Sequence, residues 1–234
     1  MKSTVAQIRA RFDKDVERFA NLETGHAAMI DGALVLELIS HSAAATNPHA
    51  THLLDIGCGA GNYSLKLLQQ LPGLNVTLID LSLPMLERAF QRVSQATTGV
   101  VQSIQGDIRE LVLPQEQYDV IVAAAVLHHL RTDAEWEAVF RQCYTSLKPG
   151  GSFWIADLIS HDYLPVQTLM WAQYGAYLTA LRDENYRDAV YHYIEAEDTP
   201  RSLIYQIDLL RQTGFRHYEI LHKNNCFAAF GGVK

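Results

Sequence analysis

Short apolar segments alternate with amphipathic segments through the middle of the chain, and this alternation limits the fold more than any other feature. Five apolar runs have strand length: Leu53–Ile56, Val76–Ile79, Val100–Ile104, Tyr118–Ala124 and Ser152–Ala156. Helical segments separate them: Tyr63–Leu71, Met85–Val93 and Asp133–Leu147. Apolar strands that alternate with helices predict a parallel sheet that is covered on both faces.

The end of the chain breaks this alternation. A helix over Ser202–Thr213 is followed by two strand-like runs, His217–His222 and Cys226–Gly231. Only Lys223–Asn225 joins them, and so short a loop permits only a hairpin. We therefore expect an α/β protein, a three-layer α/β/α sandwich whose seven-stranded, mostly parallel sheet ends in an antiparallel hairpin.

Two further segments flank this core. Apolar residues recur at helical spacing near the N-terminus, and we expect residues 1–45 to form a helical cap segment. Residues 46–234 would form the main unit of a single overall domain, with a helical insertion at about 159–197. That insertion carries many of the aromatic residues, which would either pack it onto the body or form a lid over a pocket. Open α/β sheets bind ligands at the carboxyl ends of their strands.

Composition narrows the function. The 234 residues are 48% hydrophobic and 19% charged, with a net charge of −7, which indicates an ordered globular protein. No Lys/Arg cluster suits a phosphate backbone, so a nucleic-acid partner is disfavoured. No apolar run reaches membrane-spanning length, and three widely spaced cysteines suit a reducing compartment. We expect a cytoplasmic protein without a membrane partner. The sequence is also compatible with a homodimer.

A glycine-rich turn follows the first strand of the alternation. Asp55, Gly57, Gly59 and Gly61 lie where this strand meets a helix. Glycines there allow a tight turn and let a ligand approach the backbone. An acidic residue, Asp80, closes the next strand, where a carboxylate can reach ribose hydroxyls. These features predict a site for a nucleotide-like ligand, although a plain strand-to-helix turn would explain the glycines alone.

Several motifs in order make the prediction more specific. Leu54–Gly61, Asp80 with Leu81-Ser82, Gly106-Asp107 and Leu147–Gly151 resemble the successive motifs of class I (Rossmann-like) S-adenosylmethionine-dependent methyltransferases. The resemblance covers roughly residues 50–160, and the terminal hairpin extends it. It implies S-adenosyl-L-methionine as the methyl donor and S-adenosyl-L-homocysteine as the product.

The resemblance also implies roles for individual residues. Asp55 and the turn of Gly57, Cys58, Gly59 and Gly61 would hold the methionine part of the donor. Asp80 would accept hydrogen bonds from both ribose hydroxyls. Around the adenine and the sulfonium we expect Leu81, Met85, Asp107, Ile108 and Ala124. Two structural alternatives stay open: Asp107 as a cap of the following turn, and Met85 as a core residue.

The residues that act on the methyl acceptor are harder to identify. His129 follows the fourth strand, facing the expected methyl position, and is the candidate catalytic base or substrate contact. Packing or capping would explain this histidine equally well. Phe12, Trp171 and Tyr174 are candidate substrate contacts from the cap and the insertion. Asp157, His161 and Asp162 match no metal-ligand spacing, so no metal is expected.

The favoured function is therefore in-line methyl transfer to an oxygen or nitrogen atom of a small-molecule acceptor. One alternative is an S-adenosylmethionine user that does not methylate, similar to the carboxy-S-adenosylmethionine synthases. Another is an NAD-dependent oxidoreductase, although the glycine pattern departs from Gly-x-Gly-x-x-Gly, and Tyr144 and Lys148 cannot share a helix face. A third is a protein that binds the cofactor without catalysis.

Overall fold

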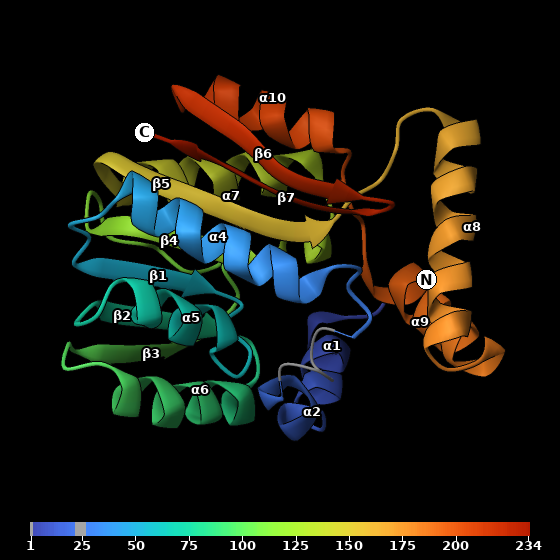
Figure 1. Cartoon of the computed structure of the whole chain (residues 1–234), viewed down its shortest axis with the longest axis horizontal. Coiled ribbons are helices and arrows are strands. Elements are labelled where there is room, and N and C mark those ends of the chain that lie inside the picture. Colours follow the sequence, from blue (N-terminus) through green and yellow to red (C-terminus); the bar gives the residue numbers. More distant parts are fainter. Residues whose placement is uncertain (1, 22–26) are drawn as a thin grey trace.

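The computed structural model describes residues 2–21 and 27–234, and its centre is one sheet of seven strands (Figure 1). The strands lie in the order β3-β2-β1-β4-β5-β7-β6. Their bounds are β1 His52–Ile56, β2 Asn75–Asp80, β3 Val101–Gln105, β4 Tyr118–Ala124, β5 Leu147–Leu158, β6 His217–Asn224 and β7 Phe227–Val233. β7 runs antiparallel to both β5 and β6, and the other strand pairs of this sheet are parallel. The predicted fold class, with a parallel sheet that ends in an antiparallel hairpin, is confirmed.

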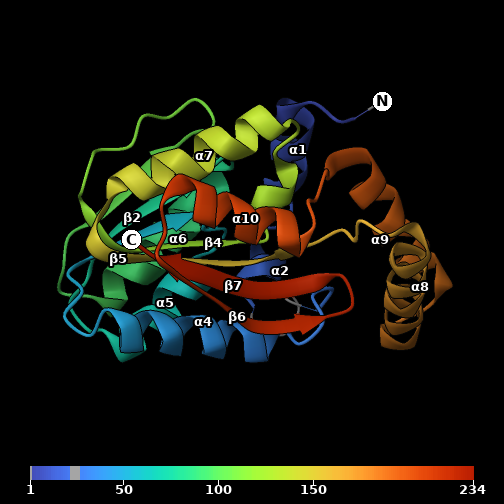
Figure 2. The same ribbon diagram turned by 90° about the horizontal axis from the view of Figure 1, so that it is seen from above.

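Helices cover both faces of this sheet. Their bounds are α4 Gly32–Thr46, α5 Asn62–Gln70, α6 Leu83–Ala96, α7 Asp133–Ser146 and α10 Leu203–Thr213. Figures 1 and 2 show α4, α5 and α6 on one face and α7 and α10 on the other. Each face has its own buried cluster, with Leu67 at 0% exposure in one and Trp136 at 0% in the other. The two apolar layers explain why both sides of β1 and β4 are apolar.

Local signals in the sequence set where several helices begin. Ser82 caps α6 by accepting a hydrogen bond from the Met85 amide, and Thr132 with Glu135 forms a capping box at α7. Side chains at these positions satisfy amide groups that have no partner inside the helix. The boundaries inferred from sequence agree with the structure to within a few residues, except that β5 starts at Leu147, five residues before the expected Ser152.

The start of the expected helical cap segment forms two short helices rather than one continuous helix. They are α1 (Val5–Phe12) and α2 (Val16–Ala20). The break falls at Asp13–Asp15, where the Asp13 carboxylate accepts a hydrogen bond of 2.6 Å from Ser82 Oγ. This hydrogen bond with the residue directly before α6 holds the chain between α1 and α2 in place. The spacing of the apolar residues does not predict it. α4, which follows, packs on the sheet against α5 and β5.

The insertion after β5 is helical, as expected. It consists of α8 (Leu164–Leu181) and α9 (Glu184–Glu197), which pack on each other beyond the end of the sheet (Figures 1 and 2). A third apolar cluster holds this pair, with Tyr174 and Leu178 fully buried. Both helices, with α1 and α2, lie at the end where the parallel strands finish. No helix in the described part of the chain has the length and apolarity needed to cross a bilayer.

Candidate active site

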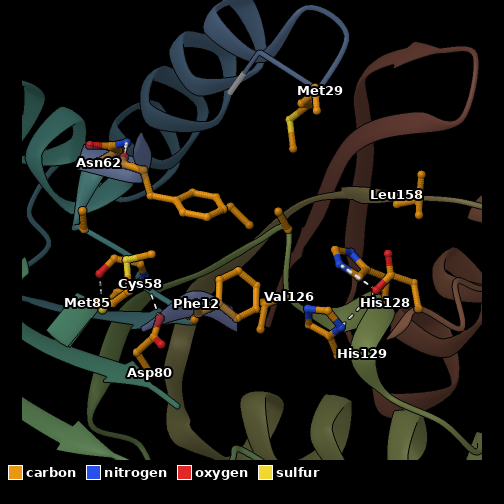
Figure 3. Close-up of a pocket in the computed structure, with 18 of the residues that line it drawn as sticks. Phe12, Met29, Cys58, Asn62, Asp80, Met85, Val126, His128, His129 and Leu158 are labelled. Carbon is orange, nitrogen blue, oxygen red and sulfur yellow. Dashed lines mark hydrogen bonds and ion pairs between the residues drawn. The ribbon is translucent and has the colours of Figure 1, made fainter. Parts of the chain in front are cut away.

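A cavity of about 200 Å³ lies at the carboxyl ends of the parallel strands. The turn after β1 and the end of β2 form one wall, and the segment after β4 forms the opposite wall (Figure 3). Apolar side chains from α1, the insertion and β7 complete the lining, among them Phe12, Tyr174 and Phe227. The site thus combines a mostly apolar surface with a few polar groups, as small-molecule sites commonly do.

Two glycines of the turn after β1 shape the first wall. Gly57 has φ +66°, and a Cβ there would lie 2.5 Å from Val126 Cγ2. This residue must therefore lack a side chain so that the turn can pass close to the segment after β4. Gly59 has φ +50°, and a Cβ there would meet no atom within 4 Å. Since Gly59 also lines the cavity, that free space is where a ligand can touch the backbone.

Asp80 fixes this turn from the end of β2. Its carboxylate accepts hydrogen bonds of 2.8 Å from the amides of Gly59 and Ser82. Burial raises the pKa of Asp80 to about 6, because it penalises the ionised form more than these hydrogen bonds favour it. A buried carboxylate in the cavity wall is ready to accept further hydrogen bonds from a ligand.

Asp55, the last acid of β1, is also in the lining and is 2% exposed. Burial raises its pKa to about 6, partly offset by a hydrogen bond of 2.6 Å donated by Ser64 Oγ. Two acids with raised pKa values thus border one side of the cavity, and this is the kind of perturbation that marks functional sites.

The opposite wall carries two adjacent histidines. His128 and His129 lie in a short 3₁₀ helix, η1 (Leu127–His129), just after Ala125, whose backbone is in the left-handed region at φ +52°. Asp157 at the end of β5 binds both the backbone amide and Nδ1 of His128. Burial lowers the pKa of His128, but Asp157 and Asp198 outweigh it and raise that pKa to about 9.

His129 differs in its surroundings. The pKa of His129 is lowered, mainly by burial and to a smaller extent by the neighbouring His128. His129 Nδ1 lies 3.1 Å from Asp198 Oδ1 without a well-aligned hydrogen bond, and His129 Nε2 has no hydrogen-bond partner among the described residues. Asp198 is the residue after α9. Burial alone would raise the pKa of its carboxyl group, but the two histidines outweigh burial and lower that pKa.

The first helix closes one side of the cavity. The Phe12 ring lies between the Asp80 wall and the histidine wall (Figure 3), with its centroid 6.0 Å from that of His129. Arg11 forms a two-pronged ion pair with Glu197 at the end of α9, with a shortest N–O distance of 2.6 Å. The Ser3 amide also donates to the Ala196 carbonyl at 2.8 Å. α1 is thereby bound to the insertion.

Most residues predicted from the sequence meet in this cavity. Those that line it are Asp55, Gly57, Cys58, Gly59, Asp80, Leu81, Met85, Ala124, His129, Phe12 and Tyr174. Four others are not in the lining: Gly61, Asp107, Ile108 and Trp171.

The positions of two of these four have clear physical causes. The Asp107 carboxylate is bound by Arg109, whose Nε lies 2.9 Å from Oδ1. Trp171 stacks on Tyr191 within the insertion, with ring centroids 5.2 Å apart.

Sequence reasoning missed Asp157 and Asp198 as partners of the histidines. Asp157 is a buried acid at a strand end, and such a position indicates a functional residue. Its proximity in sequence to His161 draws attention away from the histidines after β4. Asp198 follows the acidic run of α9 and looks like part of a solvated surface, although it is 4% exposed. Together with the two histidines it forms the group of described residues that could hold a metal ion.

Comparisons with known proteins agree with this geometry. Residues 53–151 match a methyltransferase domain family. A malonyl-[acyl-carrier protein] O-methyltransferase of Halalkalibacterium halodurans is 41% identical over 102 residues, which cover 42% of this chain and 36% of that protein. A demethylmenaquinone methyltransferase of Listeria monocytogenes is 24% identical over 189 residues, 79% of this chain and 78% of that protein.

The fold has solved counterparts. Human N-acetylserotonin methyltransferase, in complex with S-adenosylmethionine, matches with a TM-score of 0.61 at 19% identity, over 98% of this chain and 57% of that one. The sheet order, the cavity at the strand ends and the domain match agree: residues 53–151 form a methyltransferase domain, and the chain has the fold of a class I S-adenosylmethionine-dependent methyltransferase. Its methyl donor is therefore S-adenosylmethionine.

The residues present suit that donor. The free space at Gly59 would accept the methionine part against bare backbone, and Asp80 lies beside it as an acceptor for hydroxyl groups. Met85, 1% exposed, and Leu81 offer apolar contact for a flat base. The donor supplies an activated methyl group, so the protein has to align the acceptor and exclude water.

Proposed function

We propose that this enzyme transfers the methyl group to an oxygen or nitrogen atom of a small-molecule acceptor, by in-line displacement at the sulfonium. One observation carries the proposal: the histidine wall faces the cavity from the side opposite Asp80, and Nε2 of His129 is buried without a hydrogen-bond partner among the described residues. Buried polar atoms rarely stay unpaired, so a polar acceptor atom is the natural partner here. His129 would be the catalytic residue.

The rest of the cavity supports a partly apolar acceptor. Phe12, Tyr174, Leu158 and Phe227 line it. An aromatic or aliphatic body would contact these side chains, while its oxygen or nitrogen atom reaches His129. One relative is named an O-methyltransferase, which agrees with an oxygen acceptor.

On the donor side, we propose that Asp80 binds the ribose hydroxyls and that the turn with Asp55, Cys58 and Gly61 holds the methionine part. Ala124 would leave room for the sulfonium. Asp107 and Ile108 would contact the adenine only if Arg109 gives up part of its hold on Asp107.

We further propose that α1, α2 and the insertion act together as the cap of a single domain, and that the protein works in the cytoplasm. The three cysteines are buried and unpaired, which agrees with a reducing compartment. A homodimer would use the edge strand β6, where Ile220 is 54% exposed. Light scattering after gel filtration tests this last point.

The experiment is a methylation assay with a panel of small alcohols, carboxylic acids, phenols and amines. Mass spectrometry of both products separates a methylated acceptor from a modified cofactor, and calorimetry with NAD tests the oxidoreductase alternative. We expect S-adenosylhomocysteine and a methylated oxygen or nitrogen atom. His129→Ala should lower turnover by about 100-fold or more and leave cofactor affinity within a factor of about three. Undiminished turnover of that variant would remove His129 from the chemistry.

A further inference from the structure

Three side chains able to bind a metal converge on the second wall of the cavity. His128 and His129 form most of η1, and Asp198 is the residue after α9. One ligand atom from each lies within 4.8 Å of the others. We propose that these residues bind a divalent first-row transition-metal ion, although no metal is expected from the sequence alone.

The atoms at the centre of this group lack hydrogen bonds. His129 Nδ1 lies 3.1 Å from Asp198 Oδ1, and His128 Nε2 lies 3.7 Å from the same oxygen. Within residues 2–21 and 27–234, His129 Nδ1 and Asp198 Oδ1 are buried and make no well-aligned hydrogen bond. Two ligands held at about 2.0–2.2 Å from one ion lie about 3–3.5 Å apart, close to the two distances from Asp198 Oδ1 to the histidines. One cation would satisfy lone pairs on all three side chains at once.

The surroundings hold the first histidine in the orientation of a ligand. Asp157 pairs with His128 Nδ1 and also accepts from the His128 amide at 3.0 Å, so Nε2 is the ring atom left for the cavity side. A carboxylate that holds the second nitrogen of a metal-bound histidine is the usual outer partner in such sites. The Thr199 amide donates to the His128 carbonyl at 2.7 Å, which keeps Asp198 beside η1.

The ligand types indicate the kind of metal. Two imidazoles and one carboxylate suit Zn²⁺, Fe²⁺, Co²⁺ or Mn²⁺, whereas Mg²⁺ and Ca²⁺ prefer oxygen ligands. Three protein ligands also leave coordination positions open, as in catalytic rather than structural sites. His128 and Asp198 line the same cavity as the donor turn, so those positions would face the acceptor.

This inference rests on the proposed function for its chemical consequence. An acceptor hydroxyl bound to the cation would lose its proton to His129 Nε2 more readily, because the metal would stabilise the negative oxygen. That oxygen then forms a bond to the methyl carbon as the carbon–sulfur bond breaks. The electron pair of the broken bond stays on sulfur, which yields neutral S-adenosylhomocysteine. No electron is gained or lost overall, so a redox-inert ion such as Zn²⁺ is sufficient.

The test measures metal binding apart from catalysis. The full-length protein is stripped with a chelator, dialysed against Zn²⁺, Co²⁺ or Mg²⁺, and analysed by elemental mass spectrometry and calorimetry. We expect one Zn²⁺ or Co²⁺ per chain, visible d–d absorption from bound Co²⁺, and no stoichiometric Mg²⁺. Asp198→Asn should weaken Zn²⁺ binding by about 100-fold, and Asp157→Asn by about 10- to 100-fold.

A second histidine–aspartate pair outside the cavity supplies the matched control. His222 Nε2 lies 2.9 Å from Asp31 Oδ2, so His222→Ala should leave the metal content unchanged. Circular dichroism in chelator checks that each variant is folded, and His129→Gln serves if Asp198→Asn does not fold.

The two proposals fail separately. A stripped protein that binds no Zn²⁺ or Co²⁺ but still methylates an acceptor would overturn the metal site and leave the proposed function. So would metal binding that Asp198→Asn and His129→Gln do not change. A protein that binds one metal ion through these residues but methylates no oxygen or nitrogen acceptor would overturn the proposed function and leave the metal site.

Discussion

At the scale of single residues, Gly59 offers the sharpest test of how the donor binds. A Cβ at Gly59 would meet no protein atom, and the same is true of Gly150 in the turn of β5. Both residues have positive φ, +50° and +78°. An alanine at either position should therefore cost a similar strain of about 1 kcal/mol in the free protein.

Only Gly59 lines the cavity, so the two alanine variants should differ in cofactor binding. We expect Gly59→Ala to weaken S-adenosylhomocysteine binding by about tenfold or more, a loss of about 1.4 kcal/mol or more. Gly150→Ala should leave it unchanged, and the two melting temperatures should fall alike. Calorimetry and thermal unfolding measure the two effects. Equal cofactor affinities in both variants would place the ligand elsewhere.

The raised pKa values of Asp80 and Asp55, both about 6, predict how cofactor binding depends on pH. The ionised carboxylates are the forms that accept hydrogen bonds or pair with an ammonium group. Affinity for S-adenosylhomocysteine should therefore be constant above pH 7 and fall as pH decreases through 6. Titration calorimetry between pH 5 and pH 8 measures this, and Asp80→Asn should bind weakly with a shallower pH dependence. A flat profile down to pH 5 would contradict the assignment.

The same two groups act with the opposite sign on stability in the free protein. Their folded pKa values lie above the ordinary carboxyl value of 3.8, so the folded state binds their protons more tightly than the unfolded chain does. Their contribution to the free energy of unfolding is full below pH 4 and is lost as pH rises through 6. Hydroxyl groups of a bound cofactor would compensate for that loss at neutral pH.

Among the elements, α1 is held by one ion pair whose partners are unequally buried. The side chain of Glu197 is 8% exposed and that of Arg11 is 27% exposed. Arg11→Gln would leave a carboxylate buried without its cation and should cost about 1–3 kcal/mol. Glu197→Gln should lower the free energy of unfolding by less. The double variant Arg11→Gln/Glu197→Gln should be about as stable as Glu197→Gln, because neither protein leaves a buried charge unpaired.

Urea unfolding and hydrogen exchange of the α1 amides measure these effects. We expect the fastest exchange of residues 5–12 in Arg11→Gln. If the double variant were as unstable as Arg11→Gln, the ion pair would not be what holds α1 in place.

The elements themselves could largely be predicted from sequence, because each strand and helix carries a local signal. Examples of such local signals are the apolar runs at Leu53 and Val120. Two others are the capping residues Ser82 and Thr132, each directly before the helix that it starts. The donor side of the cavity follows from this, since Asp55 and Asp80 lie at the ends of the neighbouring parallel strands β1 and β2, and Gly59 lies in the turn just after β1. Register alone brings them together.

The acceptor side could not be predicted in the same way. Asp198 reaches His129 only because the insertion folds back across 69 residues of chain, and no periodicity encodes that return. The sequence predicts Trp171 in the cavity, but it is not there. Its side chain is of a type that often contacts substrates, but stacking on Tyr191 keeps it inside the insertion. Long-range packing decided both positions.

At the scale of the whole molecule, the sheet depends on close approach between β5 and β7. A Cβ at Gly231 would lie 2.3 Å from the Phe153 carbonyl oxygen and 2.4 Å from the Trp154 ring. Gly231→Ala must therefore push β7 away from its neighbour and should cost about 1–3 kcal/mol. That loss corresponds to about 2–4 °C in melting temperature per kcal/mol.

The control for this change is again Gly150→Ala, where the added methyl group meets open space. Thermal unfolding of both variants at pH 7 makes the comparison. A Gly231→Ala protein as stable as Gly150→Ala would mean that the strands separate more easily than their packing implies.

The position of α1 has a consequence for the timing of the reaction. This helix joins the donor wall, through Asp13 and Ser82, to the insertion, through Arg11 and Glu197, and its Phe12 ring lies between the two halves of the cavity. Donor and acceptor thus share one cover, and the spent cofactor leaves only when that cover opens. Release of product, rather than bond formation, is then expected to limit the cycle, and the first turnover should appear as a burst.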